Sequence, residues 1–207
     1  MTNLFIELET FRLRDFVKSD TDLLIKLNED QRVTQALFEG AHLSDYGNAE
    51  RFVDAAIENY KLNSRAECWV AERRSDNDDW LFQGWFNLSP IPDNVMSDDE
   101  YNRHIGALEM GSRLATVAWG TTLSLQIGAS LIHHAFRDCK TPYVLIHCLP
   151  LNRSAIYCAY FFGFEFAGTL LYFDQCAFQF KLTPNRFYMW NELHSSERRV
   201  RALSNTK

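Results

Sequence analysis

The feature that most constrains the fold is a long apolar stretch of helical period between two strand-like segments. Within Leu123–Phe136 the apolar residues recur every four positions, which predicts an amphipathic helix. The preceding segment, Ile105–Leu114, and the following one, Tyr143–Leu149, have the composition of strands, and Pro150 ends the second. The centre of the chain is therefore predicted to run strand, helix, strand.

The first hundred residues are predicted to contain one strand, two helices and a hairpin, followed by an acidic surface loop. A strand is indicated by alternating apolar residues, and a helix by apolar residues three or four apart. The elements are expected, in order, at Leu8–Phe16, around Leu23–Leu27, at Asn48–Leu62, at Cys68–Glu72, at Leu81–Leu88 and, for the loop, at Pro92–Asn102.

The last sixty residues complete the predicted sheet. Asn152 or Ser154 can cap a short helix that Gly163 ends. A last antiparallel pair is expected at Gly168–Leu182 and Phe187–Leu193, around a turn at residues 183–186. This order predicts an α+β fold with a mixed, mostly antiparallel twisted sheet and helices on both faces. Without a linker, we expect one domain over residues 1–195 and a polar, basic tail at 196–207.

Composition limits the classes of function. The chain has 207 residues, of which 46% are apolar and 14% aromatic, and this content excludes a disordered chain. It carries 27 acidic and 21 basic residues, a net charge of −6. An acidic surface argues against a nucleic-acid partner, which would need a basic face, and favours cationic substrates such as amines.

The sequence also gives expectations about compartment and metals. No apolar run approaches the roughly 18 residues of a membrane helix, so we expect no membrane partner. The cysteines form no C-x-x-C pair, which favours free thiols in a reducing cytoplasm over disulfides. No histidine and cysteine spacing typical of a zinc site occurs, so no metal is expected.

Three motifs together carry a resemblance to a known family. Leu8-Glu9-Thr10-x-Arg12-Leu13 opens the chain, Glu109-Met110-Gly111 precedes the central helix, and Asn152-x-x-Ala155 leads to Gly163-Phe164. In this order and spacing they resemble the GNAT N-acyltransferases, in the branch that includes the ribosomal-protein N-terminal acetyltransferases. The resemblance covers roughly Leu8 to Leu193. It implies acetyl-CoA as co-substrate and a primary amine as acceptor.

The resemblance also implies where the donor binds. The backbone of Arg113 and Leu114 would pair with the pantetheine arm, and Asn152 would hydrogen-bond to the pantetheine side. The family's phosphate loop, Arg/Gln-x-x-Gly-x-Gly/Ala, would correspond here to Trp119, Gly120, Thr121, Thr122, Leu123 and Ser124. Threonine and serine replace the last two glycines of the pattern. A helix start still presents backbone N–H groups to a pyrophosphate; the alternative is that these hydroxyls only cap the helix.

Glu109 is the candidate general base, because it is a carboxylate on an otherwise apolar strand. Burial raises the pKa of a carboxyl group towards neutrality, which suits proton abstraction. The alternative is an exposed carboxylate or an ion pair with a neighbour such as Arg113. The family's usual tyrosine acid falls on Ala159, so that role cannot be carried over. Ser154 is a weaker candidate proton donor, with helix capping as its alternative.

Two further residues have a functional and a structural interpretation. Cys148 lies on the strand expected to flank the thioester, so an acyl-cysteine route is conceivable, although a buried inert cysteine is commoner. His147 could face the acceptor, but a hydrogen-bonded strand histidine is the commoner case. Both are interpreted here as structural.

The resemblance therefore implies an acetyl-CoA-dependent N-acetyltransferase that acts on a protein N-terminus, a peptide or a small-molecule amine. An α-amine of low pKa fits a site with few catalytic groups better than a lysine does. The alternative is a non-catalytic GNAT-like module that binds acyl-CoA or a protein partner. A different acyl donor and a homodimer also stay open at this point.

Overall fold

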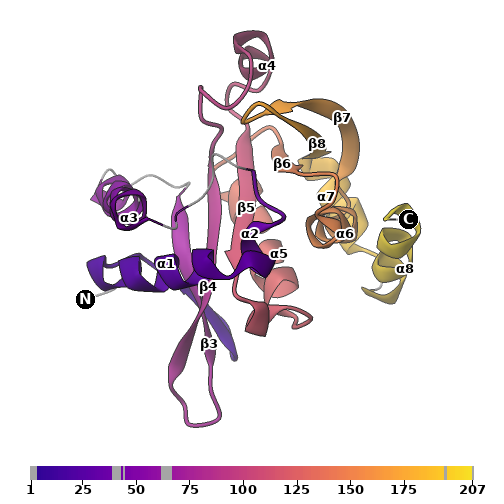
Figure 1. Cartoon of the computed structure of the whole chain (residues 1–207). Helices are drawn as coiled ribbons and strands as arrows, with labels where there is room; N and C mark the ends of the chain where they lie inside the picture. The colour runs from indigo at the N-terminus through magenta and orange to yellow at the C-terminus, as the bar shows by residue number, and fades with distance from the viewer. Residues whose placement is uncertain (1–3, 39–42, 44, 62–66, 194, 207) are drawn as a thin grey trace. The chain divides into compact units, whose positions relative to one another are not determined.

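The computed structural model describes residues 4–38, 43, 45–61, 67–193 and 195–206 (Figure 1). Contacts group the chain into two compact units. The first unit comprises Met1–Gln35, Ala41–Ser89 and Gly111–Leu131, and the second comprises Ala36–Gly40, Pro90–Met110 and Ile132–Lys207. Each unit is described by itself below. The expectation of one domain over residues 1–195 stays a prediction.

Among its described residues, the first unit contains four antiparallel strands, three helices and the beginning of a longer helix that continues in the second unit. Strands β1 (Leu4–Glu7), β2 (Phe11–Arg14), β3 (Cys68–Arg74) and β4 (Trp80–Pro90) pair in that order. Side chains from β3, from two of the helices and from the segment that follows β2 form one buried apolar cluster, because the apolar residues of each element fall on a single face. The helices are α1 (Thr21–Glu29), α2 (Gln31–Thr34) and α3 (Tyr46–Lys61), and the cluster contains Phe16, Leu24, Ala49, Val53, Ala56 and Val70.

Buried charges in this unit explain part of the first sequence motif. Arg14 donates to both carboxylate oxygens of Asp20, at 2.8 and 2.9 Å, and its Nε donates to Glu72 at 2.9 Å. Arg12 donates to the other oxygen of Glu72 at 2.6 Å. A buried ion pair needs such hydrogen bonds to offset the loss of hydration. The arginine of the first motif therefore joins β2 to β3.

The second unit contains the strand order β5-β6-β8-β7. Strand β5 (Leu108–Leu114), whose last four residues belong to the first unit, pairs in parallel with β6 (Val144–Cys148) at Leu108↔Val144 and Glu109↔Leu145. Strand β8 (Gln175–Leu182) pairs antiparallel with β6 and with β7 (Glu165–Tyr172). The described strand pairs other than β5–β6 are antiparallel. The predicted α+β class with a mixed, mostly antiparallel sheet is thereby confirmed, and the described part of the sheet has eight strands.

The helices agree with the prediction in the centre of the chain. Helix α5 (Leu123–Arg137) and helix α6 (Arg153–Phe162) lie where the apolar pattern places them. Asn152, rather than Ser154, caps α6, and Gly163 ends it with φ of +88°. A positive φ is reached at little cost only by glycine, which is why this residue marks the helix end.

The predicted last hairpin is wrong. The hairpin is β7–β8, and its turn is Phe173-Asp174, with φ of +48° and +57°. Two successive positive φ values fit a tight hairpin turn, but without glycine the sequence gives no turn signal there. Residues 184–191, expected as turn and strand, form helix α7 (Pro184–Asn191), because Pro184 suits the first helical position.

Two segments expected to be irregular are partly helical. Helix α4 (Asp98–Arg103) lies in the predicted acidic loop, where Ser97 accepts a hydrogen bond from the backbone N–H of Glu100 at 3.4 Å. The predicted tail contains helix α8 (Ser195–Asn205). The acidic first turn of α4 favours the helix dipole, a signal that turn-rich composition obscured.

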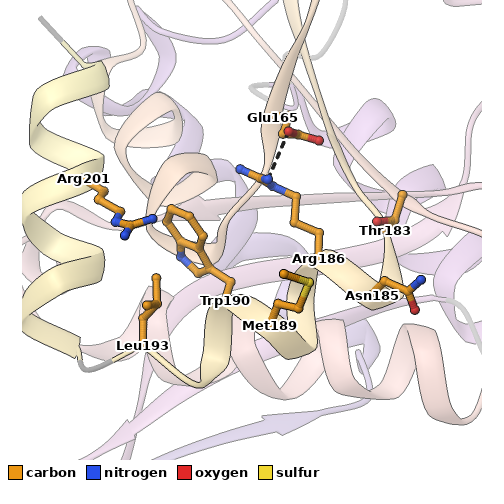
Figure 2. A pocket seen from close by; sticks show the side chains of 8 residues that line it. All are labelled: Glu165, Thr183, Asn185, Arg186, Met189, Trp190, Leu193 and Arg201. Atoms are coloured by element: carbon orange, nitrogen blue, oxygen red, sulfur yellow. Dashed lines mark ion pairs between the residues drawn. The ribbon is translucent and has the colours of Figure 1, made fainter.

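Helix α8 packs mainly on α6, and its Arg201 also lies over Trp190 of α7. Arg201 and Arg186 lie on either side of the indole, each guanidinium carbon 5.3 Å from its ring centre (Figure 2). Trp190 donates to the carbonyl of Phe161 at 2.9 Å, and Arg186 pairs with Glu165 at 3.0 Å. These residues border a hollow of about 430 Å³. Arg201 of the basic tail thus gains a cation–π contact with the indole.

No helix among the described residues is long and apolar enough to cross a membrane.

Candidate active site

Glu109 lies on β5 in the second unit, and both of its carboxylate oxygens are hydrogen-bonded. Tyr172 donates to Oε2 at 2.6 Å, and Nδ1 of His147 lies 2.9 Å from Oε1. The Glu109 side chain is 13% exposed. Two donors stabilise the negative charge of a carboxylate while leaving lone pairs for a further proton. This arrangement suits a base held in one orientation.

Strand geometry brings the partners of Glu109 together from distant parts of the sequence. Glu109 is paired in register with Leu145 of β6, and His147 lies two residues further along that strand. Because side chains alternate along a strand, Glu109 and His147 lie on the same face of the sheet. Tyr172 is the last residue of β7, next to the hairpin turn. Its ring stacks on the His147 imidazole with centres 4.4 Å apart and planes 16° apart, and Phe38 packs on Tyr172 at 5.1 Å.

A second layer of polar side chains supports His147. Gln179 is its register partner on β8, and Nε2 of Gln179 lies 3.1 Å from Nε2 of His147 and 3.1 Å from Nε2 of His104. Nδ1 of His104 lies 3.1 Å from the hydroxyl of Tyr143. We call Glu109, His147, Tyr172 and Gln179 the Glu109 cluster.

Tyr172 acts as a donor in this cluster. Burial, together with the negative charge and hydrogen bond of Glu109, raises the pKa of Tyr172 well above its usual value. The phenol is therefore held in its protonated, donating form at neutral pH. It positions the carboxylate and does not itself exchange charge.

The predicted phosphate loop lies in the first unit, after β5 and the 3-10 helix Thr116–Ala118. Thr121 donates to the carbonyl of Ala118 at 2.7 Å and accepts from the backbone N–H of Leu123 at 3.3 Å. The capping alternative therefore holds for the hydroxyl of Thr121. Thr122 is exposed and accepts from Nε2 of Gln126 at 3.1 Å.

The backbone of this loop fits an anion despite the missing glycines. Within residues 119–124 only Gly120 has a positive φ, +72°, and a Cβ placed on it would meet nothing within 4 Å. Thr122 and Ser124 thus occupy positions that any residue can adopt. Helix α5 has no acidic residue in its first turn, so its positive dipole end is not neutralised there. The residues present fit a pyrophosphate.

The residues predicted to pair with pantetheine already make contacts within the first unit. The Trp119 indole donates to the carbonyl of Leu114 at 3.0 Å. The Arg113 guanidinium is buried and donates to Asn28 of α1, and burial lowers the pKa of Arg113 to about 10. A Cβ on Gly84, at φ of +129°, would lie 2.1 Å from the carbonyl oxygen of Arg113. The role of this backbone in donor binding stays a prediction.

Asn152 and Ser154 begin helix α6 in the second unit. Asn152 accepts from the backbone N–H of Ala155 at 3.1 Å, and its Nδ2 donates to the carbonyl of Ala36 at 3.3 Å. Ser154 is exposed in the first turn. Asn152 therefore has a structural role in this helix. Its predicted contact with the donor and the predicted role of Ser154 both stay predictions.

Cys148 is buried on β6, and burial raises the pKa of its thiol to about 12. A thiol held in the protonated form is a poor nucleophile, which supports the structural interpretation of Cys148. The hydrogen bonds of His147 likewise support the interpretation of that residue as a bonded strand histidine.

Sequence reasoning found Glu109 but missed Tyr172, Gln179 and His104. Tyr172 was hidden because the hairpin turn after it lacks glycine. Gln179 and His104 are ordinary polar residues in sequence, and only the strand register makes them partners of His147. The alternation of polar residues on β8 is the one signal that could have singled out Gln179.

The sequence profile of the Acetyltransferase (GNAT) domain matches residues 10–165. The chain belongs to the GNAT acetyltransferases. The matched part includes Glu109, His147, Asn152 and the 119–124 loop, whereas Tyr172 and Gln179 lie beyond it. A comparison with curated proteins found no match.

Solved structures share the GNAT fold with this chain. RimL, a ribosomal L7/L12 alpha-N-protein acetyltransferase, is 15% identical with a TM-score of 0.65, over 88% of this chain and 95% of that one. The microcin C7 self-immunity acetyltransferase MccE, in complex with acetyl-CoA and AMP, is 12% identical with a TM-score of 0.63, over 85% and 93%. The Salmonella typhimurium acetyl transferase that modifies the N-terminal serine of L7/L12 is 14% identical with a TM-score of 0.64, over 87% and 99%.

Proposed function

We propose that this GNAT acetyltransferase transfers an acetyl group from acetyl-CoA to a primary amine, with Glu109 as the general base. The observation that carries the proposal is the Glu109 carboxylate, held by Tyr172 and His147 with 13% of its side chain exposed. RimL and MccE, which share the fold, are both acetyltransferases. The donor supplies an activated thioester carbonyl; the protein must bind, orient and deprotonate the amine.

Each predicted site residue has a role that its geometry allows. The 119–124 loop and the start of α5 would bind the pyrophosphate through backbone N–H groups, with Thr122 and Ser124 offering hydroxyls. Arg113 and Leu114 would contribute backbone groups to the pantetheine arm. Asn152 uses one amide hydrogen on Ala36 and would donate the second to the pantetheine side. Ser154 is the candidate to return a proton to the leaving thiolate.

Proton transfer follows from the hydrogen bonds of Glu109. The incoming ammonium gives one proton to Glu109, and the neutral amine then forms the new C–N bond as the C–S bond breaks. The nitrogen loses its second proton as the amide forms, and the leaving thiolate takes up one proton, so charge and atoms balance. A thiol with pKa near 8.5 leaves readily, so the absence of the family's tyrosine at Ala159 does not prevent the reaction.

The acceptor we propose is an α-amine, as at a protein or peptide N-terminus. An α-amine with pKa near 8 is roughly one-tenth neutral at pH 7, whereas a lysine near 10.4 is well under a thousandth neutral. RimL and the Salmonella protein are named for N-terminal acetylation of a ribosomal protein. The acidic net charge of −6 also favours a cationic acceptor.

The test compares two peptides that are matched except for the amine that each one offers. One has a free α-amine and no lysine; the other has an acetylated N-terminus and one lysine. With acetyl-CoA and wild-type protein, release of free thiol and acetylation of the first peptide, measured by mass spectrometry, is the expected result. Faster acetylation of the lysine peptide would contradict the acceptor, and no thiol release with any amine would support a module that only binds the donor.

A further inference from the structure

A line of buried polar side chains leads away from Glu109 through the second unit. His147 is fully buried, Gln179 is 6% exposed, and the contacts Glu109–His147, His147–Gln179 and Gln179–His104 measure 2.9, 3.1 and 3.1 Å. These contacts constrain which nitrogen of each histidine carries a hydrogen, because every buried donor needs an acceptor. The direction of the bonds can be followed outward from Glu109.

The ionised Glu109 carboxylate can only accept, so Nδ1 of His147 carries the hydrogen between them. In the neutral imidazole the other nitrogen, Nε2, then has a lone pair and needs a donor. The amide nitrogen of Gln179 is that donor. A carboxylate or an apolar side chain at position 179 would not make this bond.

The second amide hydrogen of Gln179 points to Nε2 of His104, which therefore also accepts. His104 then carries its hydrogen on Nδ1 and donates to Tyr143, whose hydroxyl donates to the carbonyl of Arg103 at 3.0 Å. One oxygen of Glu100 lies 3.0 Å from the same Nε2, and Arg103 pairs with the other oxygen at 2.7 Å. Glu100 favours a hydrogen on Nε2 of His104 and Gln179 favours a lone pair there, so Gln179 donates to His104 only while this nitrogen carries no hydrogen.

We infer that Gln179 is a positioning residue of this transferase: its amide holds His147 in the tautomer that donates to Glu109. The inference rests on the proposed function, in which Glu109 is the base. The other tautomer of His147 would turn a lone pair towards the carboxylate, and Glu109 would then have to hold a proton itself. A protonated carboxyl group cannot deprotonate the amine.

Two substitutions at position 179 have opposite expected effects on the pH profile. Gln179→Leu releases His147, so the acid limb of the kcat/KM profile moves to higher pH. Gln179→Glu requires a hydrogen on Nε2 of His147, which makes the imidazole cationic and moves the acid limb to lower pH. For Gln179→Leu, kcat falls about tenfold, equivalent to about 1.4 kcal/mol, while the Kd of acetyl-CoA is unchanged.

The control is Gln175→Leu, on the same strand. Nε2 of Gln175 is buried without a hydrogen-bond partner among the residues described, so this variant should keep the wild-type profile. A Gln179→Leu profile that coincides with that of Gln175→Leu would overturn the inference. If Gln179→Leu fails to fold, the shift expected for Gln179→Glu decides.

The tautomer itself is measured without any turnover, by ¹⁵N NMR of histidine-labelled wild-type protein, with His147→Asn to assign the signal. The expected result is a neutral His147 with its hydrogen on Nδ1, and a doubly protonated ring in Gln179→Glu. A wild-type His147 protonated on Nε2 would overturn the inference. A correct tautomer in a protein that acetylates no amine would instead contradict the proposed function.

Discussion

The Glu109 cluster and the 119–124 loop differ in how their residues are held. In the cluster, buried side chains from separate strands bond to one another, and each oxygen of Glu109 has a partner. In the loop, neighbouring residues bond to one another, and Trp119, Gly120 and Thr122 are exposed. A proton-transfer group needs fixed geometry, whereas a phosphate needs accessible backbone N–H groups.

Substitutions in the two regions should therefore affect different kinetic quantities. A change in the cluster should alter the rate of the chemical step and leave donor affinity intact. A change in the loop should alter donor affinity and leave the rate at saturation intact. Each prediction below tests one side of that separation.

The largest expected effect is that of Glu109→Gln. Loss of the general base should lower kcat by about 10²- to 10⁴-fold, with the Kd of acetyl-CoA unchanged. Turnover by thiol release and binding by calorimetry measure the two quantities. The matched control is Glu165→Gln on β7, which removes an exposed carboxylate that pairs with Arg186. This variant should keep wild-type turnover. Equal turnover in Glu109→Gln and the control would remove Glu109 from the mechanism.

Tyr172→Phe should have a smaller effect on the same step. It removes the donor to Oε2 of Glu109 while keeping the ring stacked on His147. We expect kcat to fall about tenfold and the free energy of unfolding to fall by about 1 to 3 kcal/mol, because a hydrogen bond to a charged group is lost. Chemical denaturation measures the second quantity. A stable variant with unchanged kcat would mean that Tyr172 does not position the base.

Thr122→Asp tests the loop. A negative charge at this exposed position should repel the pyrophosphate and raise the Kd of acetyl-CoA about fivefold, with kcat at saturating donor unchanged. The fold should tolerate the change, since an acidic residue before a helix favours its dipole. Thr122→Asn supplies the neutral control. Wild-type affinity in Thr122→Asp would place the phosphates elsewhere.

The smallest effect is expected from restoring the family's glycine, in Thr122→Gly. Thr122 does not have a positive φ, so glycine brings no conformational advantage there. The Kd of acetyl-CoA should stay within about twofold, and the free energy of unfolding should fall by no more than about 1 kcal/mol. A large gain in affinity, measured by the same calorimetry, would show that the threonine does impair this loop.

The two regions also differ in how far the sequence predicts them. The loop residues could be named in advance because they resemble a contiguous family pattern, and the periodic helix that follows predicted the start at Leu123. The sheet class was predictable for the same reason, since each strand carries its own pattern. Asn152 and Gly163, the two ends of α6, follow from local capping chemistry alone.

The cluster depends on register, which no local pattern specifies. Glu109 stood out as a carboxylate on an apolar strand, and His147 was named but interpreted as structural. Tyr172 and Gln179 become its neighbours through a hairpin whose turn, Phe173-Asp174, carries no glycine. Pro184, taken as part of a turn, begins a helix instead. Both errors concern the same hairpin, and together they concealed half of the cluster.

Donor binding and chemistry can be separated in one set of thermal unfolding curves. Wild-type, Glu109→Gln and Thr122→Asp proteins are each heated with and without acetyl-CoA, with CoA and ATP as ligand controls. At one hundred times its Kd the donor should stabilise the wild type by about 2.7 kcal/mol, a shift of several degrees. Glu109→Gln should show the same shift and no turnover, and Thr122→Asp a smaller shift. Loss of the shift in Glu109→Gln, or its full retention in Thr122→Asp, would contradict the division of roles between cluster and loop.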